Sequence, residues 1–265
     1  KNVDSVGQIF SISDNQRLKT LAHLDRLRSV GSQLFISNND SLSDISSLGH
    51  LRYVGEEFKI QPLTDDEIVA QAKDTLPGGL NPLDLFLQLE QCMADDSVLV
   101  VDGGDFVATA AYILAPRRPL SWLDPGVFGT LGVGGGFALA GAACRPSAET
   151  WLIYGDGSSA YSLAEFDTYV RHGMAPIALV GNDGAWNQIA RDQVELLGDA
   201  CGTELRRSDY HVVAQGYGAE GLLLDDPAKI GETLAQAQAL AKAGKPVLIN
   251  AMIGRTEFRK GSISI

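Results

Sequence analysis

Three glycine-rich turns carry the polar side chains of this sequence that are best suited to chemistry. They are Asp102-Gly103-Gly104-Asp105, Gly155-Asp156-Gly157-Ser158 and Gly181-Asn182-Asp183-Gly184. The N–H groups of such turns bind phosphate oxygens, helped by the helix dipole where the turn opens a helix. An acidic side chain beside a phosphate is repulsive, however, unless a cation lies between them. Because Mg²⁺ combines a few protein oxygen ligands with phosphate oxygens and water, Asp156 and Asn182 predict a metal–diphosphate site.

The spacing of the second and third turns resembles a motif of thiamine diphosphate (ThDP) enzymes. Asn182 follows Asp156 by 26 residues, as in the Gly-Asp-Gly…Asn motif of that family. The resemblance implies that Asp156, Asn182 and the backbone carbonyl of Gly184 bind Mg²⁺, which in turn holds the diphosphate. The family usually has two consecutive asparagines, and Gly181 stands here in place of the first.

Other parts of the sequence resemble the same cofactor site. Gly129 stands where the family uses a backbone carbonyl to hold the 4′-amino group of the pyrimidine ring. Leu131 stands where a bulky apolar residue bends the cofactor into a V shape. The resemblance also implies contacts to the diphosphate at Gly104, Asp105, Phe106, Gly157 and Ser158. Each of these residues alone is more typical of a turn, a helix cap or a core position, so the prediction depends on their shared spacing.

Within the family, residues 80–265 resemble the acetolactate-synthase-like 2-hydroxyacyl-CoA lyases. The segments that carry this resemblance are 124–132, 180–183 and 254–259. It implies an enzyme that cleaves a 2-hydroxyacyl-CoA to formyl-CoA and an aldehyde one carbon shorter. Two alternatives remain open, namely an acetolactate-synthase-type carboligase acting on 2-oxo acids and a non-catalytic binding protein or fusion fragment.

No catalytic residue is assigned within the sequence. In the family, a glutamate of a separate pyrimidine-binding domain, usually on a neighbouring subunit, drives the proton relay that activates the cofactor. Residues 1–79 leave no room for such a domain, and neither Glu67 nor Glu165 is expected to reach the pyrimidine ring. The resemblance therefore implies a homo-oligomer, or a missing segment or second chain that supplies this domain, and predicts that the chain alone is inactive.

The elements that must position the turns alternate between strand and helix. Apolar runs predict buried strands at 98–101, 151–154, 177–180, 222–224 and 247–251, with helices at 106–114, 133–143, 163–172 and 228–243. Continuous apolar character is typical of strands that are covered on both faces. We therefore expect an α/β fold with a doubly wound parallel sheet, whose ligand lies at the carboxyl ends of the strands.

Two further helix starts are predicted upstream of these strands. Thr64 followed by Glu67 predicts a capping box. Asn81 followed by Pro82 predicts an N-cap with proline at the first helical position.

The first 61 residues repeat with a period of 24. Gly7, Gly31 and Gly55 mark the period, and apolar residues recur at fixed offsets after each glycine. Such a period predicts a solenoid. The pattern resembles the leucine-rich, β-helical repeats of receptor L domains, which implies either a ligand-binding solenoid or a stacking unit without a site. The expected domains are a solenoid at 1–61, a linker at 62–79 and a ThDP- and Mg²⁺-binding domain at 80–265.

The composition narrows the range of partners. The net charge is −12, which disfavours DNA, RNA and anionic membranes as partners, and no apolar run is long enough to span a bilayer. Cys92, Cys144 and Cys201 form no CxxC pair, which fits an intracellular reducing compartment better than secretion. The expected ligand is a small molecule, either an acyl-CoA or a 2-oxo acid.

Overall fold

The computed structural model describes residues 65–126, 129–256 and Phe258. Of the preceding part of the chain it describes 5–7, 10–13, 19–21, 24, 26–30, 33–37, 47–48, 53–54 and 57–61. The chain forms two compact units, Lys1–Ala70 with Lys260–Ile265, and Gln71–Arg259.

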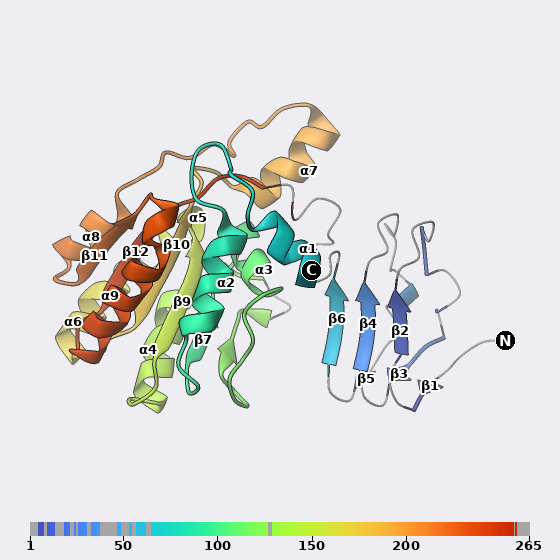
Figure 1. Ribbon diagram of the computed structural model, residues 1–265, viewed down its shortest axis with the longest axis horizontal. Coiled ribbons are helices and arrows are strands. Elements are labelled where there is room, and N and C mark those ends of the chain that lie inside the picture. Colours follow the sequence, from blue (N-terminus) through green and yellow to red (C-terminus); the bar gives the residue numbers. More distant parts are fainter. Residues whose placement is uncertain are drawn as a thin grey trace. The chain divides into compact units, whose positions relative to one another are not determined.

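A six-stranded parallel sheet forms the centre of the larger unit (Figure 1). Its strands lie in the order β11, β12, β10, β9, β7, β8, and every neighbouring pair is parallel. The bounds are β7 Val98–Val101, β8 Trp122–Leu123, β9 Thr150–Gly155, β10 Ile177–Asn182, β11 Glu220–Leu224 and β12 Val247–Met252. The predicted α/β parallel sheet is confirmed, because all five expected strands are present.

Helices cover both faces of this sheet, and each face has its own apolar core. One core includes side chains of α2 (Pro82–Cys92), α3 (Asp105–Ala110) and α9 (Ile230–Lys242). The other includes side chains of α4 (Gly134–Cys144), α6 (Glu165–His172) and α8 (Tyr210–Gly216). Neighbouring residues of a strand contribute to opposite cores, which explains why the strands are apolar without alternation.

The direction in which successive strands are added to the sheet reverses next to β7. In such sheets a ligand binds at the carboxyl ends of the strands on either side of this reversal. From β7 the chain first forms β8 on one side and then returns to form β9 on the other. Loops that leave the carboxyl ends of β7 and β9 therefore run in opposite directions and leave a crevice between them. The turns that begin at Asp102 and Gly155 lie at this switch point.

The sequence predicted most helices of the larger unit, with boundaries off by a few residues. Asn81 caps α2 as expected, since its Oδ1 accepts a hydrogen bond from the N–H of Leu83 at 3.0 Å. The segment predicted as the helix 228–243 begins as a short 3₁₀ turn, Pro227–Lys229, before α9. Strand β8 and helices α5 (Asp156–Ser159), α7 (Asn187–Leu197) and α8 were not predicted.

Among the described residues, no helix has the length and apolar character needed to cross a membrane.

The smaller unit contains short parallel strands that pair across the repeat. Strands β1 (Ser5–Val6), β3 (Ser29–Val30) and β5 (Tyr53–Val54) form one sheet, and β2 (Phe10–Ser13), β4 (Gln33–Ser37) and β6 (Glu57–Gln61) form another. Phe10 pairs with Leu34, and Leu34 pairs with Phe58, so the pairing offset equals the period of the sequence. Helix α1 (Asp65–Gln71) follows. Thr64, Gly31 and Gly55 lie outside the described residues.

Candidate functional site

Asp156 and Asn182 come together at the carboxyl edge of the sheet. Strands β9 and β10 are adjacent, and Gly155 pairs with Gly181 in their register. Asp156 directly follows Gly155, and Asn182 directly follows Gly181, so the two predicted metal ligands lie side by side. Both side chains are buried, with exposed fractions of 2% and 0%.

The carboxylate of Asp156 is held by backbone N–H groups. Its Oδ1 accepts a hydrogen bond from the N–H of Gly157, and its Oδ2 accepts one from the N–H of Gly184, both at 2.8 Å. Burial raises the pKa of this carboxyl above its ordinary value, while the two hydrogen bonds oppose that rise. A cation beside the carboxylate would offset the cost of burying the charge.

The carboxamide of Asn182 leaves one buried oxygen without a partner. Its Nδ2 donates to the carbonyl of Ser208 at 3.0 Å and to Oδ1 of Asn250 at 3.1 Å. Its own Oδ1 is buried and accepts no hydrogen bond from any described residue. A buried, unpaired polar atom is costly, and a metal ion is a partner that would satisfy this oxygen.

Gly184 completes the set of oxygens that was predicted to bind a metal. Its φ of +70° is one that glycine adopts readily. Its carbonyl accepts a hydrogen bond from the N–H of Leu205 at 2.8 Å and retains a second lone pair. No cluster of three or more His, Cys, Asp or Glu side chains that could hold a metal occurs among the described residues. One carboxylate, one amide and one carbonyl oxygen are the hard ligands that Mg²⁺ prefers.

A second acidic side chain, Asp183, is partly buried at this edge. Burial, reinforced by the nearby charge of Asp156, raises the pKa of Asp183 to about 7. A cavity of about 500 Å³ lies next to this edge and is lined by Asp183, Gly184 and Arg255, among others. Arg255 forms an ion pair of 3.2 Å with Glu204 at this cavity.

The turns after β7 and β9 are joined by a hydrogen bond. Oγ of Ser158 donates to the carbonyl of Gly103 at 3.2 Å. Gly104, with a φ of +101°, precedes α3, and Asp105 at the start of that helix forms an ion pair of 2.6 Å with Arg191 of α7. The predicted diphosphate contacts Gly104, Asp105, Gly157 and Ser158 therefore lie on two connected turns.

Phe106 has a packing role that the sequence did not reveal. Its ring is buried and lies 4.5 Å from the ring of Phe86, measured between centroids. A Cβ atom added at Gly181 would lie within 2.6 Å of three atoms of the Phe106 ring. With the ring in this place, an asparagine at position 181, as in the usual family motif, would clash with Phe106.

Replacing Gly181 by asparagine, which would restore the usual motif, is expected to destabilise the chain. The added side chain would force the Phe106 ring out of the core, and such overpacking costs about 1–3 kcal/mol in the free energy of unfolding. Urea denaturation would measure this loss. Gly136→Ala is the matched control, because a Cβ there meets no atom within 4 Å and alanine favours a helix. A Gly181→Asn chain as stable as the parent would show that the ring moves aside at little cost.

The predicted pyrimidine-side segment is anchored by Asp102, which belongs to the first of the three glycine-rich turns but was not predicted to contact this segment. The carboxylate of Asp102 accepts hydrogen bonds from the N–H of Gly132 at 2.9 Å and from the N–H of Gly134 at 2.7 Å. The side chain of Leu131 fills the space that a Cβ at Gly103 would need. Gly129 has a φ of +53°. Asp102 could have been identified as an acidic residue that directly follows a buried strand.

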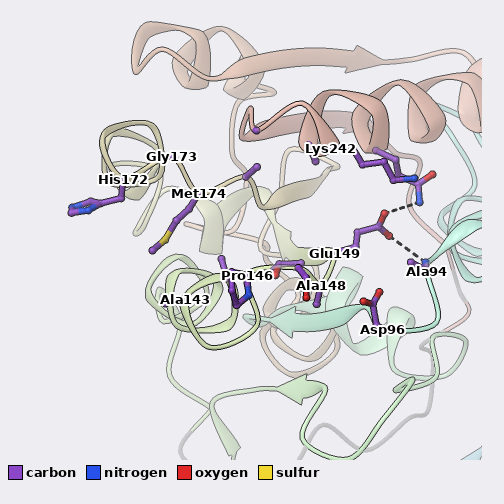
Figure 2. Close-up of a pocket in the computed structure, with 17 residues that line it drawn as sticks. Ala94, Asp96, Ala143, Pro146, Ala148, Glu149, His172, Gly173, Met174 and Lys242 are labelled. Atoms are coloured by element: carbon purple, nitrogen blue, oxygen red, sulfur yellow. Dashed lines mark hydrogen bonds between the residues drawn. The ribbon is translucent and has the colours of Figure 1, made fainter.

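A larger cavity, of about 700 Å³, lies at the opposite, amino edge of the sheet (Figure 2). The carboxylate of Glu149, which lines this cavity, already has hydrogen-bond partners within the chain. Oε1 of Glu149 accepts hydrogen bonds from Nε1 of Trp151 at 2.6 Å and from Oγ of Ser97 at 3.2 Å, and Oε2 accepts one from Nε2 of Gln238 at 2.9 Å. His172, at the rim, points away from Glu149 (Figure 2). The Glu149 carboxylate and the His172 imidazole do not point toward each other. The candidate site is therefore the edge of the sheet at the carboxyl ends of its strands.

Comparisons with known proteins agree with this geometry. Residues 102–251 match the family described as "Thiamine pyrophosphate enzyme, C-terminal TPP binding domain". The chain is 52% identical over 198 residues to 2-hydroxyacyl-CoA lyase 2 of Danio rerio, covering 74% of this chain and 32% of that protein. It is 53% identical over 188 residues to the Homo sapiens protein of the same name, covering 70% and 30%. The acetolactate synthase large subunit of Mycobacterium tuberculosis is 34% identical over 180 residues, covering 68% and 32%.

A solved structure shows the same fold. The ThDP-dependent 4-hydroxybenzoylformate decarboxylase of Rhodococcus jostii matches with a TM-score of 0.63 and 17% identity, over 94% of this chain and 49% of that one. The chain spans about a third of the length of the curated relatives named above. The resemblance of residues 1–61 to receptor L domains finds no support in these matches.

Proposed function

Because the chain belongs to the thiamine pyrophosphate enzymes, as their C-terminal cofactor-binding domain, we propose that Asp156, Asn182 and the carbonyl of Gly184 hold the Mg²⁺ that binds the cofactor's diphosphate. The unpaired, buried Oδ1 of Asn182, on the strand next to the one that ends at Asp156, is the observation that supports this most strongly. The test is a calorimetric titration of the chain with ThDP, with Mg²⁺ and with a chelator in its place. Binding that does not depend on Mg²⁺ would contradict the proposed metal site.

The two connected turns would hold the diphosphate around this metal. The N–H groups of Gly104, Asp105 and Phe106 lie at the start of α3, and Gly157 and Ser158 lie in α5. The N–H groups at a helix start can bind phosphate oxygens, although the N–H of Gly157 already donates to the carboxylate of Asp156.

The pyrimidine ring would lie on the segment that Asp102 anchors. The Gly129 carbonyl would accept a hydrogen bond from the 4′-amino group, and Leu131 would support the bent form of the cofactor. When bound, ThDP supplies the nucleophilic carbon and the electron sink of the reaction. The residues of this domain orient the cofactor and keep water from it.

For the whole protein, we propose carbon–carbon lyase activity on a 2-hydroxyacyl-CoA. The support is the identity of about half of the matched residues to proteins named 2-hydroxyacyl-CoA lyase 2. A carboligase acting on 2-oxo acids is the second candidate, because an acetolactate synthase is 34% identical. A separate pyrimidine-binding domain, in a homo-oligomer or supplied by another segment, would complete either site. Assays with a 2-hydroxyacyl-CoA and with pyruvate would distinguish the two activities.

We further propose that residues 1–61 form a solenoid of the L-domain type, separate from the cofactor domain. The parallel pairing of Phe10 with Leu34 and of Leu34 with Phe58 supports this proposal. So few repeats bury little apolar surface, so we expect limited proteolysis to cut first within 1–61. First cuts within 100–250 would contradict this division of the chain.

A further inference from the structure

Asn250 is a buried residue beside the proposed metal site that the sequence analysis did not select. It lies on β12, where it pairs with Val180 of the neighbouring strand β10. Asn182 is two residues further along β10, so its side chain projects from the same face of the sheet as that of Asn250. Asn250 is fully buried.

Asn250, Asn182 and the carbonyl of Ser208 form a closed triangle of hydrogen bonds. Nδ2 of Asn182 donates to Oδ1 of Asn250 at 3.1 Å and to the Ser208 carbonyl at 3.0 Å. Nδ2 of Asn250 donates to the same carbonyl at 3.0 Å and lies 3.3 Å from Nδ1 of His211. Both N–H bonds of the Asn182 amide are thus used within this triangle.

The triangle determines which way the Asn182 amide faces. If the amide were turned by half a rotation, its oxygen would face two acceptors, Oδ1 of Asn250 and the Ser208 carbonyl, and both of its hydrogen bonds would be lost. In the observed orientation, the unpaired Oδ1 faces away from the triangle. An N–H group in that place could not bind a cation, since an amide nitrogen is a donor only.

We infer that Asn250 is a positioning residue for the metal site: it holds the Asn182 carboxamide with its oxygen toward Mg²⁺. This inference rests on the proposed metal site. Groups that hydrogen-bond to metal ligands orient them in this way, and their loss weakens metal binding without removing any ligand. Neither the spacing of the motif nor the family pattern quoted above includes Asn250.

The test is Asn250→Leu in the full chain, with Mg²⁺ affinity measured by calorimetry in the presence of saturating ThDP. We expect Mg²⁺ affinity to fall about tenfold, the lower end of the range for groups that hold a metal ligand in place. The circular-dichroism spectrum of the metal-free variant should match that of the parent chain. A purely structural role would instead lower the thermal midpoint without a loss of Mg²⁺ affinity.

Asn81→Leu provides the matched control. Asn81 is also a buried asparagine, and its Nδ2 donates to the carbonyls of Gln71 at 2.8 Å and Asp74 at 3.1 Å. Its replacement should lower the thermal midpoint but leave Mg²⁺ affinity unchanged. If Asn250→Leu does not fold, Asn250→Ser replaces it, because the shorter hydroxyl cannot reach Asn182 and leaves room for a water molecule.

The outcomes separate this inference from the proposed function. If the parent chain binds ThDP in a Mg²⁺-dependent manner but the folded Asn250 variant keeps the parent's Mg²⁺ affinity, the positioning role of Asn250 is wrong. The proposed metal site is not contradicted by that result. If the parent chain shows no Mg²⁺ dependence, the proposed metal site is wrong, and the inference falls with it. A tenfold loss in the Asn250 variants but not in Asn81→Leu supports both.

Discussion

Replacing Asp156 by alanine is expected to abolish Mg²⁺-dependent binding of ThDP while the sheet stays folded. The substitution removes the only charged side chain among the three proposed ligands. Groups that merely orient a ligand change metal affinity by about 10- to 100-fold, so loss of this ligand should cost about 100-fold or more. The N–H of Gly184 would lose its acceptor, but a buried carboxyl whose pKa is raised by burial would be removed as well, and the two effects on stability oppose each other.

Calorimetry with ThDP and Mg²⁺ measures this loss, and circular dichroism checks the fold. Asp226→Ala is the control, because Asp226 also accepts a backbone hydrogen bond at a helix start, from Ala228 at 3.0 Å, but belongs to the turn after β11. It should leave ThDP affinity unchanged. Parent-like affinity in Asp156→Ala would exclude Asp156 as a metal ligand.

The isolated chain is expected to show no turnover with ThDP, Mg²⁺ and either a 2-hydroxyacyl-CoA or pyruvate. A general acid–base group contributes about 10²- to 10⁴-fold to a rate, and the family's activating glutamate belongs to a separate pyrimidine-binding domain. Within the larger unit, the candidate internal substitute is Glu165 on α6. Its side chain packs beside Gly135 at the start of α4, where its Cγ would lie 2.9 Å from a Cβ at Gly135.

A fusion protein that supplies the missing pyrimidine-binding domain is the positive control for this experiment. Residues 71–265 would be joined to the part of the Danio rerio relative that this chain does not match, and the fusion should turn over at least about 100-fold faster than the chain alone. Robust turnover by the chain alone would contradict the prediction. Loss of that turnover in Glu165→Gln would then identify Glu165 as the group that had been overlooked.

Local sequence was sufficient to predict the five main strands of the sheet and to select Asp156 and Asn182 as residues of one site. Strands such as β10 are continuously apolar because both faces are covered, and that pattern is visible in any short window. The turns that follow β9 and β10 then had to meet, because adjacent parallel strands end at the same edge. Helix α7 was missed for the opposite reason, since it has no buried residue and its sequence therefore lacks a core-facing stripe.

The remaining parts of the site depend on contacts between distant segments. Asn250 reaches Asn182 only because β12 pairs with β10 in one particular register, and no spacing within the sequence encodes that register. Asp102 anchors Gly132 and Gly134 across 30 and 32 residues. Gly181 departs from the usual family motif, and the side chain that an asparagine there would meet is a ring 75 positions earlier in the chain.

The contact between Phe106 and Gly181 also bears on how this family can diverge. Phe106 belongs to the apolar core and Gly181 to the motif beside the proposed metal site, yet each limits the size of the side chain at the other position. An asparagine at 181 together with a phenylalanine at 106 would overpack this part of the core, and a smaller side chain at 106 would relieve it. Substitutions at positions 106 and 181 therefore depend on each other. The glycine at 181 fits this chain because its neighbour in the core is a phenylalanine.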